Sequence, residues 1–372
     1  MIPLRVLFAI PELDRGGPDR VLFELLTRLD RNRFAPRLLV SKAEGHYLSR
    51  LPADVPVTIL GDARARDRYP ILRALAKVRR DAPDLVFATL RMNITMGIVA
   101  RAFPARTRLI LRQANDVSAD FAMLVKQSPV KHRLTQRVLI SAFRRANAIV
   151  CQSEAMRRDV GSLMGDFGSL HVIANPIDVD RIATLAAVRS VTLRGRPALV
   201  SVGRLMHQKG HDLLLRALTE VRTSHPEVHL TVLGDGPDLG TLRSLARELG
   251  IEDIVTFAGF SAEPLPFVRA ADLFVLGSRY EGLPNAALEA LACGTPIVLT
   301  DCPGANSTVV TAVNGRLAAT DPAGIARAIE AAIRDLPVFE RHRIVADCAA
   351  RYSCERIVAA YEHLFEAVTA QT

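Results

Sequence analysis

The chain has 372 residues, of which 49% are hydrophobic and 23% are charged, and its formal net charge is +9. This length is too great for most single hydrophobic cores and suits two domains of ordinary size. We therefore expect neither a disordered protein nor an integral membrane protein, because there is no low-complexity tract and no apolar run approaches the ~18–20 residues of a membrane span.

The five cysteines form no C-x-x-C pair and show no zinc-ligand spacing; they are residues 151, 293, 302, 348 and 354. A reduced cytoplasm is the simplest compartment for such a chain, with no disulfide and no bound metal expected.

The first predicted element is a buried strand over residues 2–10, which is too short and too interrupted by Arg5 for a signal peptide. It leads into a glycine-rich loop, where Gly16 and Gly17 precede a helical pattern that starts at Val21. Two glycines let a backbone approach a ligand closely. The alternative is an ordinary turn between a strand and a helix.

Two further apolar strands of the first half, 85–90 and 109–112, end in polar residues. Ligands of open α/β sheets bind at the carboxyl ends of the strands. The strand ends therefore suggest side chains that line a ligand site, and these are Arg91, Asn93, Arg112, Asn115 and Asp116.

Residues 131–145 alternate basic and apolar side chains at nearly helical spacing and include no acid. Residues 1–190 carry a charge of +13 and residues 191–372 a charge of −4. An anionic membrane surface or an anionic acceptor would suit this basic helix. The alternative is a core-packing helix whose arginines reach water. Nucleic acid is not expected, because Trp is absent and no nucleic-acid motif occurs.

A basic loop follows the apolar strand 198–203 and precedes a helical pattern that begins near His211. Within it, Arg204 follows Gly203 and stands five residues before Lys209. An arginine and a lysine at this distance can engage two oxygens of a diphosphate from different directions. The alternative is a solvated basic turn.

The next strand, 230–234, ends in a turn that contains Gly234 and Gly236 and leads to a helix over 238–249. Such a turn is also favourable without any ligand. Residues 254–260 form another predicted strand and loop.

The segment 281–289, which is Glu-Gly-Leu-Pro-Asn-Ala-Ala-Leu-Glu, lies between an apolar strand at 272–277 and another near 297. Pro284 suits the first position of a helix, and the unpaired amides of a helix start attract phosphate or sugar oxygens. Glu281 in the loop can accept hydrogen bonds from hydroxyls. Glu289 lies deeper along the same helix and can reach another part of one long ligand. The alternative is two ordinary surface glutamates.

Taken together, these motifs resemble the retaining glycosyltransferases of family 4, also called glycosyl transferases group 1, and the resemblance covers nearly the whole chain. It implies an α/β GT-B fold, with two Rossmann-like domains and a cleft between them. It also implies an N-terminal acceptor-side domain of residues 1–178, a nucleotide-sugar-binding domain of 179–351, and a C-terminal helix of about 352–372 that packs back on the first domain. The D-x-D pattern at 178–180 lies at the expected hinge, so we do not interpret it as a metal signature.

The resemblance assigns catalytic roles to Arg204, Lys209 and Glu281, with the two cations stabilising the departing nucleoside diphosphate. The donor-binding residues that it implies are Gly16, Gly17, Gly203, Gly234, Gly236, Gly282, Leu283, Pro284, Asn285, Ala286 and Glu289, the last of which would hold ribose hydroxyls. Many relatives have a histidine after a middle strand of the first domain, where this chain has Arg112 and Asn115. The acceptor-side residues that the resemblance suggests are Arg91, Asn93, Arg112, Asn115 and Asp116.

We therefore expect a cytoplasmic enzyme, peripheral on the inner face of the membrane, that moves a sugar from a nucleotide-sugar donor to a saccharide or lipid-linked acceptor, in cell-surface polysaccharide, lipopolysaccharide or glycolipid synthesis. No cofactor or metal is expected. The alternatives are a sugar-nucleotide epimerase of the same architecture and a non-catalytic sugar-nucleotide-binding subunit of a polysaccharide assembly complex. A related sugar phosphorylase would need a pyridoxal lysine, which is not evident.

Overall fold

The computed structural model describes residues 2–14, 16–61, 71–115, 117–118, 129–165 and 167–370. The chain divides into two compact units. Unit 1 consists of Met1–Pro176 and Cys354–Thr372, and unit 2 is Ile177–Ser353. The division expected from the sequence places these boundaries at 178 and 351.

Unit 1 contains a seven-stranded parallel sheet with the order β3-β2-β1-β4-β5-β6-β7. Its strands are β1 (Leu4–Ile10), β2 (Phe34–Val40), β3 (Val57–Ile59), β4 (Leu85–Thr89), β5 (Arg108–Arg112), β6 (Ala148–Cys151) and β7 (Leu170–Val172). The central strands are almost wholly buried apolar runs, as expected for a parallel sheet covered on both faces.

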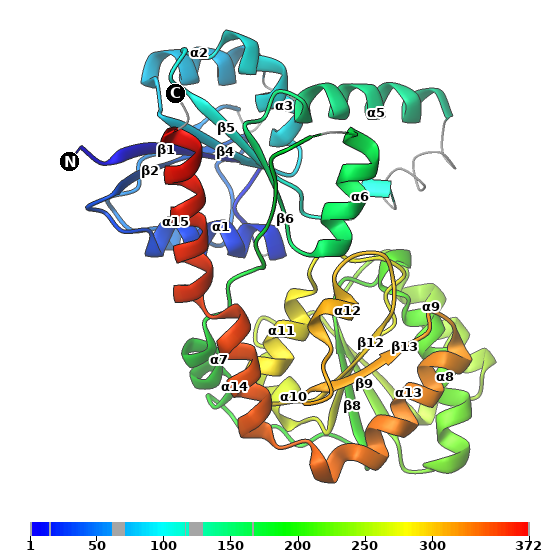
Figure 1. The fold of residues 1–372 in the computed structure, drawn as a ribbon. Coiled ribbons are helices and arrows are strands. Elements are labelled where there is room, and N and C mark those ends of the chain that lie inside the picture. The colour runs from blue at the N-terminus through cyan, green and yellow to red at the C-terminus, as the bar shows by residue number, and fades with distance from the viewer. Residues whose placement is uncertain are drawn as a thin grey trace. The chain divides into compact units, whose positions relative to one another are not determined.

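Helices cover both faces of this sheet (Figure 1). They are α1 (Gly17–Arg28), α2 (Ile71–Asp81), α3 (Met92–Val99), α5 (Pro129–Phe143), α6 (Glu154–Met164) and α15 (Cys354–Ala370). One core joins α1 and α15 to one face of the sheet, and the other core joins α2, α3 and α6 to the opposite face.

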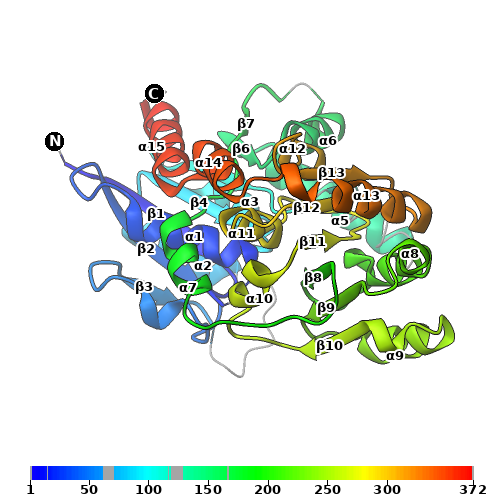
Figure 2. The same cartoon turned by 90° about the horizontal axis from the view of Figure 1, so that it is seen from below.

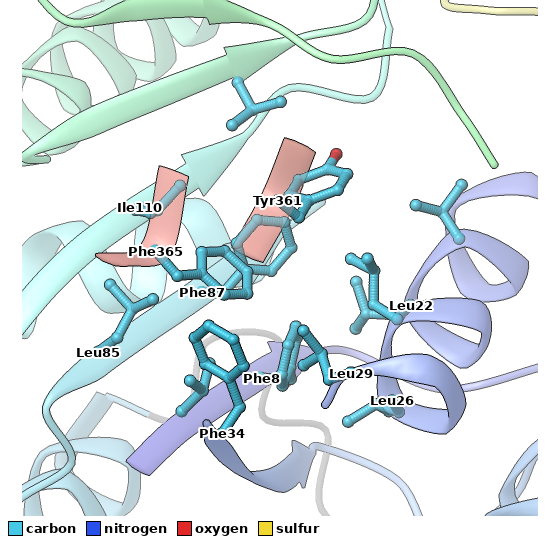
Figure 3. Close-up of a cluster of buried hydrophobic side chains, with 14 of the residues drawn as sticks. Phe8, Leu22, Leu26, Leu29, Phe34, Leu85, Phe87, Ile110, Tyr361 and Phe365 are labelled. Atoms are coloured by element: carbon cyan, nitrogen blue, oxygen red, sulfur yellow. The ribbon is translucent and has the colours of Figure 1, made fainter. Parts of the chain in front are cut away.

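The helix α15 contributes aromatic side chains to the centre of the first core (Figure 3). The ring of Phe365 lies 6.0 Å from that of Phe8, 5.6 Å from that of Phe87 and 6.1 Å from that of Phe34, measured between centroids. Edge-to-face packing of this kind adds to the free energy gained from burial alone. A segment that follows unit 2 in the sequence is therefore part of the core of unit 1.

Unit 2 contains a six-stranded parallel sheet with the order β10-β9-β8-β11-β12-β13. Its strands are β8 (Ala198–Val202), β9 (His229–Leu233), β10 (Val255–Gly259), β11 (Leu273–Leu276), β12 (Ile297–Thr300) and β13 (Gly315–Ala318). Its helices are α7 (Val179–Ala186), α8 (His211–Ser224), α9 (Leu239–Glu248), α10 (Leu265–Ala270), α11 (Asn285–Ala292), α12 (Asn306–Val309), α13 (Pro322–Asp335) and α14 (Arg341–Tyr352). The pair α8 and α13 and the pair α7 and α10 each lie side by side (Figures 1 and 2).

The strand order of each sheet reverses at one point, where open α/β sheets bind their ligands. In unit 1 the reversal lies between β1 and β4, and in unit 2 it lies between β8 and β11. The loops that follow these four strands, together with the helices that those loops enter, contain most of the site residues predicted from the sequence.

The C-terminal helix, expected over about 352–372, starts two residues later in the structure. The helix α14 ends at Tyr352, Ser353 is extended with φ −53° and ψ 147°, and α15 starts at Cys354. Asp178 accepts a hydrogen bond of 3.0 Å from the amide of Arg181 and so caps α7. In the described part of the chain, no helix combines the length and the apolar character that a bilayer crossing requires.

Candidate functional site in unit 2

The loops that follow β8 and β11 meet in an ion pair. The ammonium of Lys209 lies 2.6 Å from Oε1 of Glu281, and the same oxygen accepts a hydrogen bond of 2.6 Å from the hydroxyl of Ser278. The Lys209 and Glu281 side chains are only 20% and 6% exposed. No described residue bonds Oε2 of Glu281, so this oxygen can accept a hydrogen bond from a ligand.

Additional polar contacts hold the two loops together. The guanidinium of Arg279 binds both carboxylate oxygens of Asp212, at 2.8 and 2.7 Å, and the Arg279 amide donates to the carbonyl of Gln208 at 2.7 Å. This bidentate pair lowers the pKa of the Asp212 carboxyl below its ordinary value. The amide side chain of Gln208 donates to the carbonyl of Tyr280 at 3.1 Å. The Lys209–Glu281 pair is thus fixed by its flanking residues.

Close backbone contacts in this region require glycine. Gly210 has φ +58°, and a Cβ there would lie 1.9 Å from the carbonyl oxygen of Gly277. Gly304 has φ +123°, and a Cβ there would lie 1.8 Å from the carbonyl oxygen of Glu281. Side chains at these positions would force the loops apart.

Among the glycines predicted to bind the donor, Gly234 and Gly236 also lie against the backbone of another loop, whereas Gly203 does not. A Cβ at Gly234 would lie 1.9 Å from the carbonyl oxygen of Gly203, and one at Gly236 would lie 2.2 Å from that of Leu205. At Gly203 a Cβ would touch only the aliphatic stem of Lys209, at an ordinary 3.7 Å. Gly234 and Gly236 therefore bring the loop after β9 against the loop after β8.

The helix α11 begins at Asn285, and Pro284 is its N-cap residue with φ −73°. The expectation that Pro284 is the first helical residue is thus wrong by one position, because its ψ of 96° is extended rather than helical. Gly282 and Leu283 are buried ahead of the helix, whereas Asn285, Ala286 and Glu289 are half-buried on it. The helix start directs its positive dipole end toward the loop of Glu281.

Arg204 lies in the turn after β8 and is exposed. Within the described ranges, no carboxylate pairs with it, in contrast to Lys209. A guanidinium without a fixed partner is free to bind a phosphate.

His211, the first residue of α8, was not predicted as a site residue. Its side chain is 3% exposed, and neither ring nitrogen has a hydrogen-bond partner among the described residues. Burial lowers the pKa of this imidazole to about 4, and the charge of Lys209 contributes. The ring is therefore neutral at physiological pH and adds no charge beside Lys209. No local sequence signal separates such a histidine from an apolar residue.

In unit 1, Gly16 is the N-cap of α1 and Gly17 is its first residue. The buried carboxylate of Asp19 accepts hydrogen bonds from the amides of Gly16, at 3.0 Å, and of Asp14, at 3.2 Å. Burial raises the pKa of Asp19 to about 6, and the nearby Glu12 and Asp14 contribute. Sequence reasoning did not single out Asp19, although its place three residues after Gly16 is that of a capping residue.

The structure brings together two of the predicted acceptor-side residues. The amide nitrogen of Asn93 donates to the carbonyl of Arg112 at 3.0 Å. The Arg112 side chain is 1% exposed, and its Nη2 donates to Oδ1 of Asn175 at 2.6 Å. Arg91 is exposed at the start of α3, and Asn115 is half-buried. Asp116 lies outside the described residues.

Arg112 is thus a buried cation between the sheet of unit 1 and α15. The charge of its guanidinium acts on the buried phenol of Tyr361, whose pKa is raised by burial. Two of the Arg112 nitrogens, Nε and Nη1, have no partner in the described part of the chain. A role for Arg112 toward an acceptor stays a prediction.

A metal centre would need several ligating side chains that converge. In the described residues, no group of three or more His, Cys, Asp or Glu side chains is placed to hold a metal ion.

Two family models match the chain, and they follow the division into units. The model described as glycosyltransferase family 4 matches residues 15–181, and that described as glycosyl transferases group 1 matches residues 188–346.

Two relatives have similar sequences. A lipopolysaccharide core biosynthesis glycosyltransferase, LpsE of Rhizobium meliloti (strain 1021), is 33% identical over 60% of this chain and 66% of its own length. The N-acetylgalactosamine-N,N'-diacetylbacillosaminyl-diphospho-undecaprenol 4-alpha-N-acetylgalactosaminyltransferase of Campylobacter jejuni is 29% identical over 78% of this chain and 79% of its own length. The chain thus matches about two thirds of the first of these relatives and more of the second.

The fold is also that of solved structures. Anabaena HepE, solved in complex with UDP and with UDP-glucose, superposes with a TM-score of 0.77 at 22% identity, covering 98% of this chain and 100% of HepE. The two parallel sheets and their helices confirm the α/β, GT-B prediction. From the two family models, the relatives and the fold together, the chain belongs to glycosyltransferase family 4, among the glycosyl transferases of group 1.

Proposed function

We propose that this protein transfers a sugar from a nucleotide-sugar donor to an acceptor hydroxyl, with retention of the anomeric configuration. The observation that carries this proposal is the Lys209–Glu281–Ser278 cluster beside the start of α11, at the reversal point of the unit 2 sheet. HepE, which shares the fold, binds UDP and UDP-glucose.

In this proposal the diphosphate of the donor binds to Arg204 and Lys209. Two observations support this role: Arg204 is exposed in the turn after β8, and Lys209 is held at the cluster by Glu281. As the bond between the sugar carbon and the phosphate oxygen breaks, the two cations stabilise the charge that develops on the departing diphosphate. These cations take the part that a metal ion has in other transferases, so we propose that transfer needs no bound metal.

Glu281 binds hydroxyls of the donor sugar through Oε2, and Glu289, one turn into α11, binds the ribose hydroxyls. The acceptor hydroxyl attacks the sugar carbon on the face from which the diphosphate leaves. Its proton passes to an oxygen of that diphosphate, so this step needs no carboxylate base.

The acceptor that we propose is a saccharide or a lipid-linked saccharide of cell-surface polysaccharide, lipopolysaccharide or glycolipid synthesis. The functions of LpsE and of the Campylobacter enzyme support this class. We also propose that the protein works in the cytoplasm, peripherally on the inner face of the membrane. The +13 charge of residues 1–190 supports this contact, because anionic lipids attract basic surfaces.

The test is release of nucleoside diphosphate from a panel of nucleotide sugars, with and without candidate acceptors and with EDTA. We expect release of nucleoside diphosphate that depends on the acceptor and is insensitive to EDTA. The NMR coupling constant at the new linkage should indicate the same anomeric configuration as in the donor. A changed sugar without an acceptor would instead indicate an epimerase. Binding of a donor without any turnover would indicate a non-catalytic subunit.

A further inference from the structure

A groove rich in arginine lies on unit 1, along the basic segment 131–145 that the sequence analysis singled out. It has a volume of about 470 Å³, and we call it the α5 groove. It is lined by Arg101, Arg137, Ile140, Ser141, Arg144 and Arg145. Arg101 belongs to a short helix over Ala100–Ala102, and the other residues follow one face of α5 and the turn after it, at helical spacing.

Close packing of α3 on α5, which lie side by side in Figure 1, brings these elements together. A Cβ at Gly97 in α3 would lie 2.3 Å from Cβ of Ala142 in α5, so only glycine permits this approach. Arg145 follows three residues after Ala142, and its Nη1 donates to the carbonyl of Gly97 at 3.1 Å. Arg101 follows four residues after Gly97. The contact between the two small residues therefore places Arg101 beside Arg145.

The α5 groove holds four positive charges without a matching negative one. Its lining includes no acid, and none of the four arginines has a carboxylate partner among the described residues. Burial lowers the pKa of Arg145, and the charge of Arg101 lowers it further. The C-terminal ends of α3 and α5 each favour one nearby cation, so they account for only two of the four positive charges. An anion would remove this repulsion.

The spacing of the arginines indicates what kind of anion fits. Arg137 on α5 and Arg144 in the turn after it are seven residues apart, which corresponds to about 10 Å between their backbone positions along one helix face. Four guanidinium groups distributed over this length can engage more than one phosphate. Guanidinium groups bind phosphate oxygens in a bidentate manner, so phosphate suits these side chains well. We propose that the α5 groove binds a ligand with more than one phosphate group, presented by a phosphorylated saccharide or by neighbouring lipid headgroups.

The α5 groove is separate from the predicted acceptor site. The helix α3 leaves β4 at the carboxyl edge of the sheet, and the chain re-enters the sheet at Arg108, so α3 ends at the amino edge. The helix α5 ends at the same edge, ahead of β6. Arg91 and Asn93 lie at the carboxyl edge, about 15 Å away along strands of five residues. The proposal therefore does not rest on the proposed sugar transfer, while its lipid-headgroup form specifies the membrane contact proposed above.

The test uses the full chain with Arg204→Gln in every sample, which weakens phosphate binding at the donor site. Two double variants are compared with this background, Arg101→Gln/Arg145→Gln and Arg137→Gln/Arg144→Gln. Inorganic tripolyphosphate is titrated by calorimetry, and vesicles of phosphatidylcholine with and without phosphatidylglycerol are co-sedimented. We expect each double variant to weaken binding by about tenfold or more. Hydrogen exchange should show protection by the bound probe at residues 97–106 and 136–146.

The matched control is Arg216→Gln/Arg243→Gln, which removes two exposed arginines of unit 2 and changes the net charge equally. Loss of tripolyphosphate binding would indicate a soluble phosphorylated ligand, and loss of vesicle binding alone would indicate lipid headgroups. Either loss supports the proposal if the control binds as the background does. Unchanged binding of both probes, or equal losses in the control, would overturn it. Arg101→Gln alone removes a repulsion, so this variant should fold even if a double variant does not.

Discussion

At the scale of single residues, the charges of Lys209 and Glu281 stabilise each other, because both side chains are largely buried. Removing one charge leaves the other buried without its partner, which costs about 3–5 kcal/mol in buried pairs. We expect Lys209→Met to reduce kcat/KM at least ~10- to 100-fold through the loss of a charge-assisted bond. It should also lower the midpoint of chemical unfolding.

The double variant Lys209→Met/Glu281→Gln separates the two effects. It leaves no unpaired buried charge, so its unfolding midpoint should return toward that of the wild type while its activity stays low. If the double variant regained activity together with stability, Lys209 and Glu281 would have a structural role only. Chemical unfolding and initial-rate kinetics on the same preparations make this comparison.

Asp19 provides a prediction about pH. Its pKa is raised to about 6, so the folded protein binds this proton more tightly than the unfolded chain does. A raised carboxyl pKa lowers stability as pH rises from about 4 to about 6, by up to about 3 kcal/mol. Asp19→Asn can keep the acceptor for the Gly16 and Asp14 amides and lacks the buried charge.

We therefore expect Asp19→Asn to be more stable than the wild type at pH 8, by about 1–3 kcal/mol. The difference should become small near pH 4, where the wild-type carboxyl is protonated in the folded state and about half protonated in the unfolded chain. Urea unfolding of both proteins between pH 4 and pH 8 measures this. A difference that does not change with pH would show that the charge of Asp19 is not the cause.

At the scale of elements, the loops after β8 and β11 are held by a contact that only glycine permits. We expect Gly210→Ala to lose at least about 1–2 kcal/mol of stability, because alanine is unfavourable at φ +58° and its Cβ would collide with the Gly277 carbonyl. Gly203→Ala is the matched control in the same loop, since its Cβ meets only the Lys209 stem at 3.7 Å. Thermal unfolding should distinguish the two variants, and equal midpoints would contradict the argument.

Local patterns in the sequence predicted the elements that carry the candidate site. The apolar runs near 198–203 and 272–277 correspond to β8 and β11, and the helical pattern from His211 corresponds to α8. These patterns depend on neighbours a few residues apart, which a single sequence displays. They also indicated the Lys209 and Glu281 loops, because strand ends in an α/β fold are the usual ligand sites.

Contacts between distant residues could not be predicted in this way. Arg279 pairs with Asp212, which is 67 residues away in the sequence, and no neighbouring residue indicates this ion pair. Arg112 has the charge of a ligand-binding residue, yet its side chain is almost fully buried against Asn175. The packing of Gly97 against Ala142 likewise could not be predicted from the sequence, because it depends on how α3 and α5 pack together.

At the scale of the whole molecule, each unit has its own sheet and core, and the core of unit 1 includes α15. We expect Phe365→Ala to destabilise unit 1 by about 3–5 kcal/mol, because the ring packs among Phe8, Phe34 and Phe87. Hydrogen exchange read by mass spectrometry should show faster exchange in β1, β2 and β4. The strands of unit 2 should keep most of their protection.

The control for this variant is His363→Ala, which changes an exposed residue of the same helix. It should leave exchange in both units close to that of the wild type. Faster exchange of both units to the same extent in Phe365→Ala would show that the two cores unfold as one.

The placement of α15 also determines when each core can be completed on the ribosome. Translation produces β1–β7 first, then all of unit 2, and only afterwards the helix that supplies Tyr361 and Phe365. The aromatic side chains of the unit 1 core therefore stay uncovered while unit 2 is synthesised and acquires all of its strands. Such a surface is a binding site for chaperones during synthesis and a cause of aggregation when release is premature.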